Sequence, residues 1–146
     1  MGIISGCRAV LHRLGTADQK VAWLSKGKLS KREVLKCALS ENPVLRQKSW
    51  EVLNQNPSLI IKLVACDESG NRCFSGDVER LFRRPDALPA TIAKVFAGLM
   101  FDPFKKEDID RAVRVLKFHP VTVQGEIMSE LGLLKHELFG ALRRFL

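Results

Sequence analysis

The stretch that decides the fold is the last one, from Thr122 to Leu146, TVQGEIMSELGLLKHELFGALRRFL. Its apolar residues recur at three- and four-residue steps, which is the spacing of one face of an α-helix. Gly132 stands in the middle of this run, and glycine enters the left-handed backbone conformation of a turn at little cost. The pattern predicts two amphipathic helices, from about residue 123 to 131 and from about 135 onward, joined by a turn at Gly132.

This segment resembles the helix-turn-helix of Cro-type DNA-binding regulators. Gln124 matches the polar opening position, which in that family contacts the DNA backbone. Two residues depart from the family pattern: Met128 replaces a small residue, and Leu134 replaces a polar N-cap. A plain helical hairpin would show the same apolar spacing, so both interpretations stay open. The residues that match buried positions of the motif are Ile127, Leu131, Leu133 and Leu138.

The residues just before this pair extend the resemblance to a winged-helix module. Val121, Thr122 and Val123 are all β-branched, which favours a short β segment over 121–123. A helix predicted to end at His119-Pro120 precedes them, because the residue before proline leaves the helical region. Helix, short β segment, helix, turn and helix is the order of that module, although no residues for a wing follow.

Helix start signals recur along the rest of the chain. Asn42-Pro43 and Asn56-Pro57 each combine an N-cap residue with a proline suited to the first helical position. These two echoes are too few to indicate a helical repeat array. We expect an all-α compact bundle of about seven or eight short helices. Further predicted starts are Thr16, the capping box Ser30–Glu33, Ser75 and Asp102-Pro103.

The expected organisation is one compact unit with two parts. Residues 1–102 would form a helical domain with a basic N-terminal third, and residues 103–146 would form the helix-turn-helix-like segment packed on it. Residues 1–15 have the pattern of a short amphipathic helix. Gly2 and Cys7 invite a lipidation hypothesis, but Gly6 stands where the myristoylation pattern requires Ser or Thr.

The charge balance favours a polyanionic partner. The 146 residues include 24 Lys and Arg against 16 Asp and Glu, a net charge of +8. Nucleic acid is the first expectation, DNA before RNA, and an anionic membrane surface is the second. The excess of basic residues is six in residues 1–56 and two in residues 103–146. A composite surface is therefore expected, with contributions from both ends of the chain.

The leading hypothesis is a small nucleic-acid-binding regulator or accessory protein. In the second helix of the tail, the predicted groove contacts are Lys135, His136, Arg143 and Arg144. Phosphate contacts are expected from Gln124 and from a basic cluster at a predicted helix start. That cluster consists of Lys26, Lys28, Lys31 and Arg32. The alternative interpretation of these four residues is a solvent-exposed basic turn that binds no phosphate.

The alternative is a helical adaptor or assembly protein. The stretch CDESGNRCFSGDVERL, residues 66–81, resembles the central segment of tailed-phage tail assembly chaperones, which implies a viral or phage assembly role. A protein partner, or a second copy of the chain, would cover an apolar face of the last helix. That face would consist of Leu134, Leu138, Phe139, Phe145 and Leu146. Membrane contact through residues 1–15 is a third and weaker option.

No catalytic constellation, metal-ligand spacing or cofactor motif is recognisable, so a non-enzymatic protein without a metal or cofactor is expected. The four cysteines form no C-x-x-C pair, and the three histidines lie in different segments. Scattered, unpaired cysteines and the absence of a recognisable secretory signal favour an intracellular location, cytoplasmic or in the nucleoid or nucleus. No apolar run approaches the length of a transmembrane helix.

Overall fold

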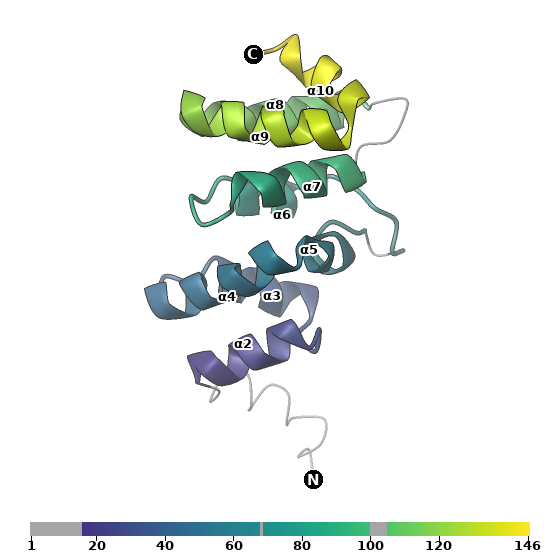
Figure 1. Cartoon of the computed structure of the whole chain (residues 1–146). Coiled ribbons are helices and arrows are strands. Elements are labelled where there is room, and N and C mark those ends of the chain that lie inside the picture. The colour runs from purple at the N-terminus through teal and green to yellow at the C-terminus, as the bar shows by residue number, and fades with distance from the viewer. Residues whose placement is uncertain (1–15, 68, 100–104) are drawn as a thin grey trace. The chain divides into compact units, whose positions relative to one another are not determined.

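The computed structural model describes residues 16–67, 69–99 and 105–146. This part of the chain forms nine α-helices and no sheet, which confirms the all-α prediction (Figure 1). The predicted helix over residues 1–15 and the start at Asp102-Pro103 lie outside the described residues. The helices are α2 Ala17–Ser25, α3 Lys31–Ala38, α4 Pro43–Gln55, α5 Pro57–Leu63, α6 Gly76–Phe82, α7 Pro89–Leu99, α8 Lys106–Phe118, α9 Val121–Leu134 and α10 His136–Arg143.

Side-chain caps set most of the predicted helix starts. The Thr16 hydroxyl accepts a hydrogen bond from the Gln19 backbone N–H at 3.1 Å, and the Gln19 side chain accepts one from the Thr16 N–H, also at 3.1 Å. The Asn42 side-chain oxygen accepts hydrogen bonds from the backbone N–H groups of Val44 at 3.0 Å and Leu45 at 3.3 Å. Ser30 and Ser75 cap α3 and α6 in the same way. These bonds satisfy helix N–H groups that have no partner within the helix.

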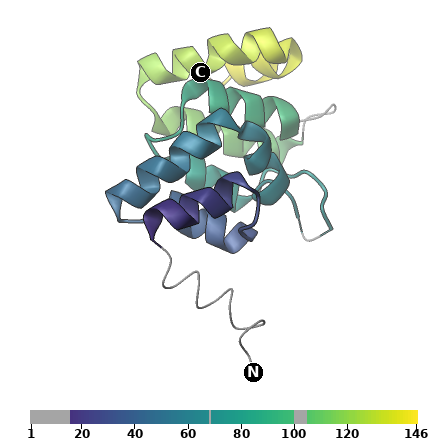
Figure 2. The same ribbon diagram turned by 60° about the horizontal axis from the view of Figure 1, so that its bottom comes forward.

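The described chain divides into two compact units within α4, after Val52. The two-part organisation with a boundary at residue 102 stays a prediction. In the N-terminal unit α2, α3 and α4 follow one another through short connections, drawn in purple to blue in Figures 1 and 2. Trp50 joins two of them, because its buried indole N–H donates a hydrogen bond of 3.0 Å to the Ala38 carbonyl. Trp50 is thus a core residue, as the apolar pattern predicts.

The C-terminal unit, from Leu53 to Leu146, is built by helices that stack on every second neighbour. Helix α5 packs on α7 and α7 on α9, while α6 packs on α8 and α8 on α10 (Figure 1). Consecutive helices α8, α9 and α10 also contact one another. This order is typical of proteins built by stacking helix pairs. It leaves the outer side of the α6, α8 and α10 row free of a further layer within this unit.

Helix α7 provides the centre of this unit. The Phe96 ring lies 5.2 Å from the Phe74 ring centroid and 5.9 Å from that of Phe82, which ties α7 to α6 and to the segment before it. Contact between α5 and α7 is close at Gly98, where an added Cβ would lie 2.7 Å from the Ile61 Cδ1 atom. The α7 side chains that are buried are Thr91, Ile92, Ala93, Val95, Phe96 and Leu99.

The tail differs from its prediction at two points. Helix α9 begins at Val121 and continues through Gly132 to Leu134, so the predicted turn at Gly132 and the β segment over 121–123 are both wrong. A β-branched run needs a neighbouring strand to form a ladder, and the described residues offer none here. A Cβ at Gly132 would meet the Phe139 ring at 3.5 Å, an ordinary van der Waals distance, so α10 packs over this position without requiring a glycine. The bend occurs at Lys135, and Leu133 is 86 % exposed instead of buried.

Candidate functional site

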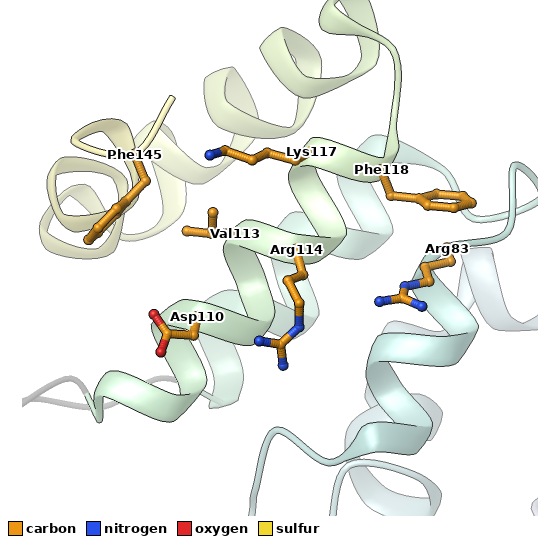
Figure 3. Close-up of a pocket in the computed structure, with 7 residues that line it drawn as sticks. All are labelled: Arg83, Asp110, Val113, Arg114, Lys117, Phe118 and Phe145. Atoms are coloured by element: carbon orange, nitrogen blue, oxygen red, sulfur yellow. The ribbon is translucent and has the colours of Figure 1, made fainter.

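A basic groove lies on the outer side of α8 in the C-terminal unit, with a volume of about 500 Å³ (Figure 3). Three segments line it: the end of α6, the length of α8, and the residues after α10. The lining side chains carry three positive charges and one negative charge. We call this site the α8 groove; its residues are Arg83, Asp110, Val113, Arg114, Lys117, Phe118 and Phe145.

The amphipathic sequence of α8 places the charged side chains in the groove. Ile109, Ala112, Val115 and Leu116 are buried against the rest of the unit. Side chains three, four and seven residues apart share one face of a helix. Asp110, Val113, Arg114 and Lys117 have these spacings, so they project together on the face opposite the buried stripe (Figure 3).

Glu79 of α6 holds two of the arginines in place. Its carboxylate accepts hydrogen bonds from Arg114 Nε at 2.7 Å and from Arg83 Nη2 at 3.1 Å. The Arg114 hydrogen bond lowers the pKa of Glu79 below its ordinary value, and this effect outweighs the opposing effect of burial. The Glu79 side chain is only 13 % exposed, whereas those of Arg83 and Arg114 are 45 % and 51 % exposed. Glu79 Oε2 also accepts a longer hydrogen bond of 3.4 Å from Arg114 Nη2, so this carboxylate offsets one positive charge while about half of each arginine side chain stays exposed.

Two phenylalanine rings stand at opposite ends of the groove. Phe118 is 59 % exposed and Phe145 is 49 % exposed, and Figure 3 shows Val113, Arg114 and Lys117 between them. Phe118 continues the apolar pattern of α8 in sequence, yet it is exposed because it lies beyond the buried stripe, at the last residue of the helix. The Arg83 guanidinium lies 5.8 Å from the Phe118 ring centroid, a cation–π arrangement.

The residues after Phe118 fix the end of α8. His119 is buried, and its Nε2 atom forms a hydrogen bond with the Phe82 carbonyl at the end of α6. The His119 carbonyl accepts a hydrogen bond of 2.7 Å from Gln124 Nε2. Gln124 was expected to contact a DNA backbone; in the structure it is half-buried and its amide is engaged within the chain. These bonds fix the end of the helix from which Phe118 projects.

The predicted recognition residues surround Phe139 on α10. The His136 ring stacks on the Phe139 ring with centroids 6.1 Å apart, and the Arg143 guanidinium lies 6.0 Å from the same ring. Arg144 is exposed at the C-terminal cap of α10, next to the groove residue Phe145. Lys135 is half-buried at the bend. Arg143 and Arg144 directly precede the groove residue Phe145 in sequence, although neither side chain lines the α8 groove.

The predicted partner face is only partly available. Leu138 is fully buried because it belongs to the side of α10 that packs inward, so its assignment to an exposed face is wrong. Phe139 is half-buried against Gly132. Three predicted partner residues remain accessible, namely Leu134, Phe145 and Leu146.

The basic cluster near the start of α3 belongs to the N-terminal unit. Lys26 and Lys28 are exposed in the connection after α2, Arg32 is exposed in the first turn of α3, and Lys31 is half-buried. Gly27, between the two lysines, has a φ of +67°. The structure thus places these residues on one short connection and the helix it leads into, in a different unit from α10.

No group of metal-ligating side chains gathers in residues 16–67, 69–99 and 105–146. Cys66 Sγ donates a hydrogen bond of 2.8 Å to the Ile61 carbonyl. Burial raises the pKa of the Cys37 thiol, which disfavours its thiolate form. None of the helices in the described part of the chain is both long and apolar enough to cross a bilayer.

Sequence reasoning found only Phe145 of the α8 groove. The pattern of Asp110, Arg114 and Lys117 opposite an apolar stripe was visible in the sequence and marked an exposed charged face. Arg83 carried no such signal, since only the packing of α6 on α8 brings it to the same surface. The exposure of Phe118 could not be predicted, because Phe118 stands at the end of an apolar pattern in the sequence.

Comparisons with models of known protein families, with curated proteins and with solved structures found no match to this chain. The resemblances to Cro-type regulators and to tail assembly chaperones accordingly stay predictions.

Proposed function

We propose that the chain is a non-enzymatic nucleic-acid-binding protein that holds a phosphate backbone in the α8 groove. The observation that carries the proposal is the convergence of Arg83, Arg114 and Lys117 on one groove from two helices. Arginine and lysine at a groove neutralise phosphates and release condensed counterions, which supplies most of the affinity of such proteins. The net charge of +8 adds a long-range attraction for any polyanion.

Glu79 holds two of these residues at the groove, because its carboxylate accepts hydrogen bonds from both Arg83 and Arg114. It also offsets one of their charges, so Lys117 is the cation of the groove that it leaves unopposed. Phosphate oxygens arriving from solvent would use the remaining guanidinium N–H groups and the Lys117 ammonium. Asp110, at the Phe145 end of the groove, opposes an anion there (Figure 3). The phosphate path is therefore expected on the Arg83, Arg114 and Lys117 side.

Other cations extend the proposed surface without a helix-turn-helix. Arg143 and Arg144 precede Phe145 and would contact phosphates beyond the groove. The cluster of Lys26, Lys28 and Arg32 would give the N-terminal unit an independent phosphate contact. No turn at Gly132 and no insertion of α10 into a duplex is required.

The experiment is a fluorescence-anisotropy titration of labelled DNA and RNA with the whole protein across a salt series. Arg83→Ala with Lys117→Ala should weaken binding and reduce the dependence of log affinity on log salt by about 1 for each lost phosphate contact. Lys62→Ala with Lys94→Ala is the matched control, since both lysines are exposed in the C-terminal unit outside the groove. Equal losses in the two double variants would contradict the groove assignment, and no binding at low salt would contradict the function.

A protein-binding role is the second candidate, favoured by apolar residues exposed along α9. Val121 and Leu133, near opposite ends of α9, are 81 % and 86 % exposed, and Leu134, Phe145 and Leu146 are each about half exposed. A partner, or a second copy of the chain, would remove these side chains from water. Sedimentation of the purified protein tests self-association: this role predicts a dimer that Leu133→Ser with Leu134→Ser dissociates, and a strictly monomeric wild type would exclude the second copy.

A further inference from the structure

The α8 groove combines accessible aromatic rings with cations. A duplex could contact the cations, but its stacked bases could not stack on the rings. In duplex DNA or RNA the base faces are covered by their neighbours, so a protein reaches only base edges and the backbone. An unpaired strand exposes base faces that stack on aromatic side chains, while its phosphates need cations alongside. The order of side chains across the groove is ring, cations and ring (Figure 3).

We infer that the α8 groove binds single-stranded nucleic acid, with bases stacked on Phe118 and Phe145 and with phosphates held by Arg83, Arg114 and Lys117. This inference rests on the proposed function and specifies its substrate class. The shared chemistry is an unpaired base on a phosphate backbone, which single-stranded DNA and RNA both provide.

The position of Phe118 is set by the fold. Phe118 is the last residue of α8, and the next residue, His119, is buried and hydrogen-bonded to the Phe82 carbonyl. Arg83 lies against the Phe118 ring at 5.8 Å and gives it a cationic neighbour. Because Arg83 lies over one face of the ring, a base on Phe118 would stack on the other face.

The backbone of Phe145 is also held, because its N–H donates a hydrogen bond of 3.1 Å to the Leu142 carbonyl of α10. Its ring projects toward Val113 and Asp110 at the other end of the groove (Figure 3). A strand running between the rings passes Arg114 and Lys117, which project from adjacent turns of α8. The cations therefore lie where the backbone between two stacked bases would run.

Short duplexes fit this geometry poorly. The α8 side of the groove is the flank of a helix packed against the unit, with Ile109, Ala112 and Leu116 buried beneath it. Among the described residues the groove is lined by the side of α8 and not by a helix end, whereas duplex readers generally place a helix or strand in the major groove. Duplex contact here is limited to backbone charges and gains nothing from the two rings.

The test compares one labelled mixed-sequence DNA strand, the same strand annealed to its complement, and an RNA strand of equal length. Phe118→Leu with Phe145→Leu keeps apolar side chains but removes both aromatic faces. We expect tighter binding of the single strands than of the duplex, and a loss of roughly 5-fold to 150-fold in single-strand affinity for each ring removed. The salt dependence should stay unchanged, because no phosphate contact is lost. Leu133→Ala is the matched apolar control, exposed in the same unit outside the groove.

A second variant tests stacking directly and does not depend on affinity alone. Phe118→Trp places an indole at the groove, and its emission should be quenched when an unpaired strand binds but not when the duplex binds. Trp23 and Trp50 give the background, measured in the wild-type protein. Thermal melting of each variant checks the fold, which both half-exposed positions are expected to tolerate.

The outcomes separate this inference from the proposed function. Equal affinity for single strand and duplex, with Phe118→Leu and Phe145→Leu inert and Arg83 and Lys117 important, would overturn the inference and leave nucleic-acid binding intact. If poly-glutamate bound as tightly as the single strands, and the ring variants left its affinity unchanged, the inference would be overturned in favour of an acidic protein ligand. If none of the strands bound at low salt, both the inference and the proposed function would be contradicted.

Discussion

Asn54 on α4 caps the N-terminus of α7 at Leu88: its side-chain oxygen accepts a hydrogen bond of 3.1 Å from the Leu88 backbone N–H. The same oxygen accepts a hydrogen bond of 2.9 Å from the Thr91 hydroxyl, and the Asn54 amide donates one of 3.0 Å to the Asp86 carbonyl. A cap supplied by another helix ties the start of α7 to residues far away in sequence. Helix α7 is the one around which the C-terminal unit packs, so the stability of the unit depends on this side chain.

Replacing Asn54 by Ala should lower the free energy of unfolding by about 1–3 kcal/mol. The change removes the cap and leaves the Thr91 hydroxyl, a buried group, without its acceptor. Urea titration followed by circular dichroism measures the effect. Gln55→Ala, at the exposed neighbouring position on the same helix, is the control and should change stability by less than about 0.5 kcal/mol. Equal stability of the two variants would show that the cap contributes little.

Gly98→Ala should leave the free energy of unfolding within about 0.5 kcal/mol of wild type, because a gain in helix propensity and a contact with Ile61 oppose each other. The new Cβ would lie 2.7 Å from Ile61 Cδ1, closer than carbon atoms approach, so the end of this flexible side chain must turn away, at a cost of about 1 kcal/mol. Alanine favours the helix over glycine by about 1 kcal/mol, which offsets that cost.

Thermal unfolding of Gly98→Ala in an Ile61→Val background isolates that contact. Valine lacks the Cδ1 atom, so the alanine should then stabilise the protein, and the two changes should not be additive. Gly125→Ala is the control, because nothing lies within 4 Å of the added Cβ in α9. That variant should gain roughly 0.5–1 kcal/mol. Absence of a gain from Gly98→Ala in the Ile61→Val background would point to a different obstacle.

Glu79→Gln should remove part of the pH dependence of stability in acid. The pKa of Glu79 is lowered chiefly by the Arg114 hydrogen bond, so the folded state favours the carboxylate. A lowered folded-state pKa contributes stability above the unfolded value, here about 4.3, and this contribution is lost as the pH falls through the folded value. The variant should be about 1 kcal/mol less stable than wild type at pH 7 and equally stable near pH 2.

Urea unfolding from pH 7 to pH 2 measures this difference. Glu130→Gln provides the control, since Glu130 is exposed on α9 and does not line the α8 groove, and it should track wild type throughout. A gap between Glu79→Gln and wild type that is constant with pH would mean that the loss comes from packing and not from the charge.

Arg143→Ala with Arg144→Ala should weaken nucleic-acid binding less than the groove variants do. Arg143 rests on Phe139 and Arg144 caps α10, so both lie outside the α8 groove and would contact phosphate only at its edge. The slope of log affinity against log salt should fall by about 1 or 2. Anisotropy titrations in parallel with Arg83→Ala and Lys117→Ala give the comparison. A larger loss in the arginine pair than in the groove pair would restore the tail as the main contact surface.

The fold was predictable where signals are local. Thr16, Ser30, Asn42 and Ser75 start helices because their side chains bond to backbone N–H groups within the next three residues. Pro120 ends α8 for a similarly local reason. The turn at Gly132 was predicted wrongly because a helix also tolerates an isolated glycine, and α9 continues through it to Leu134. A glycine inside a helix and a glycine at a turn look alike in sequence.

The candidate site was less predictable because its residues meet only through packing. Arg83 and Phe118 lie on different helices, and the stacking of α6 on α8 brings them within 5.8 Å. Leu138 shows the converse case, since its apolar side chain was assigned to a partner and is buried within the chain. Helical periodicity gives the face of one helix but not which neighbour covers that face.

The stacking of alternate helices in the C-terminal unit also determines how local opening should spread. Helix α7 has neighbours on two sides in its row, α5 and α9, whereas α10 ends its own row on α8. Amide protons in α7 should therefore exchange with solvent only when the whole unit opens, while those of α10 exchange through detachment of that helix alone. Phe145, at one end of the α8 groove, follows the helix expected to detach most readily. The α8 groove would thus include Phe145 only while α10 is docked on the unit. A ligand that contacts Phe145 would therefore slow amide exchange in α10 more than in any other helix.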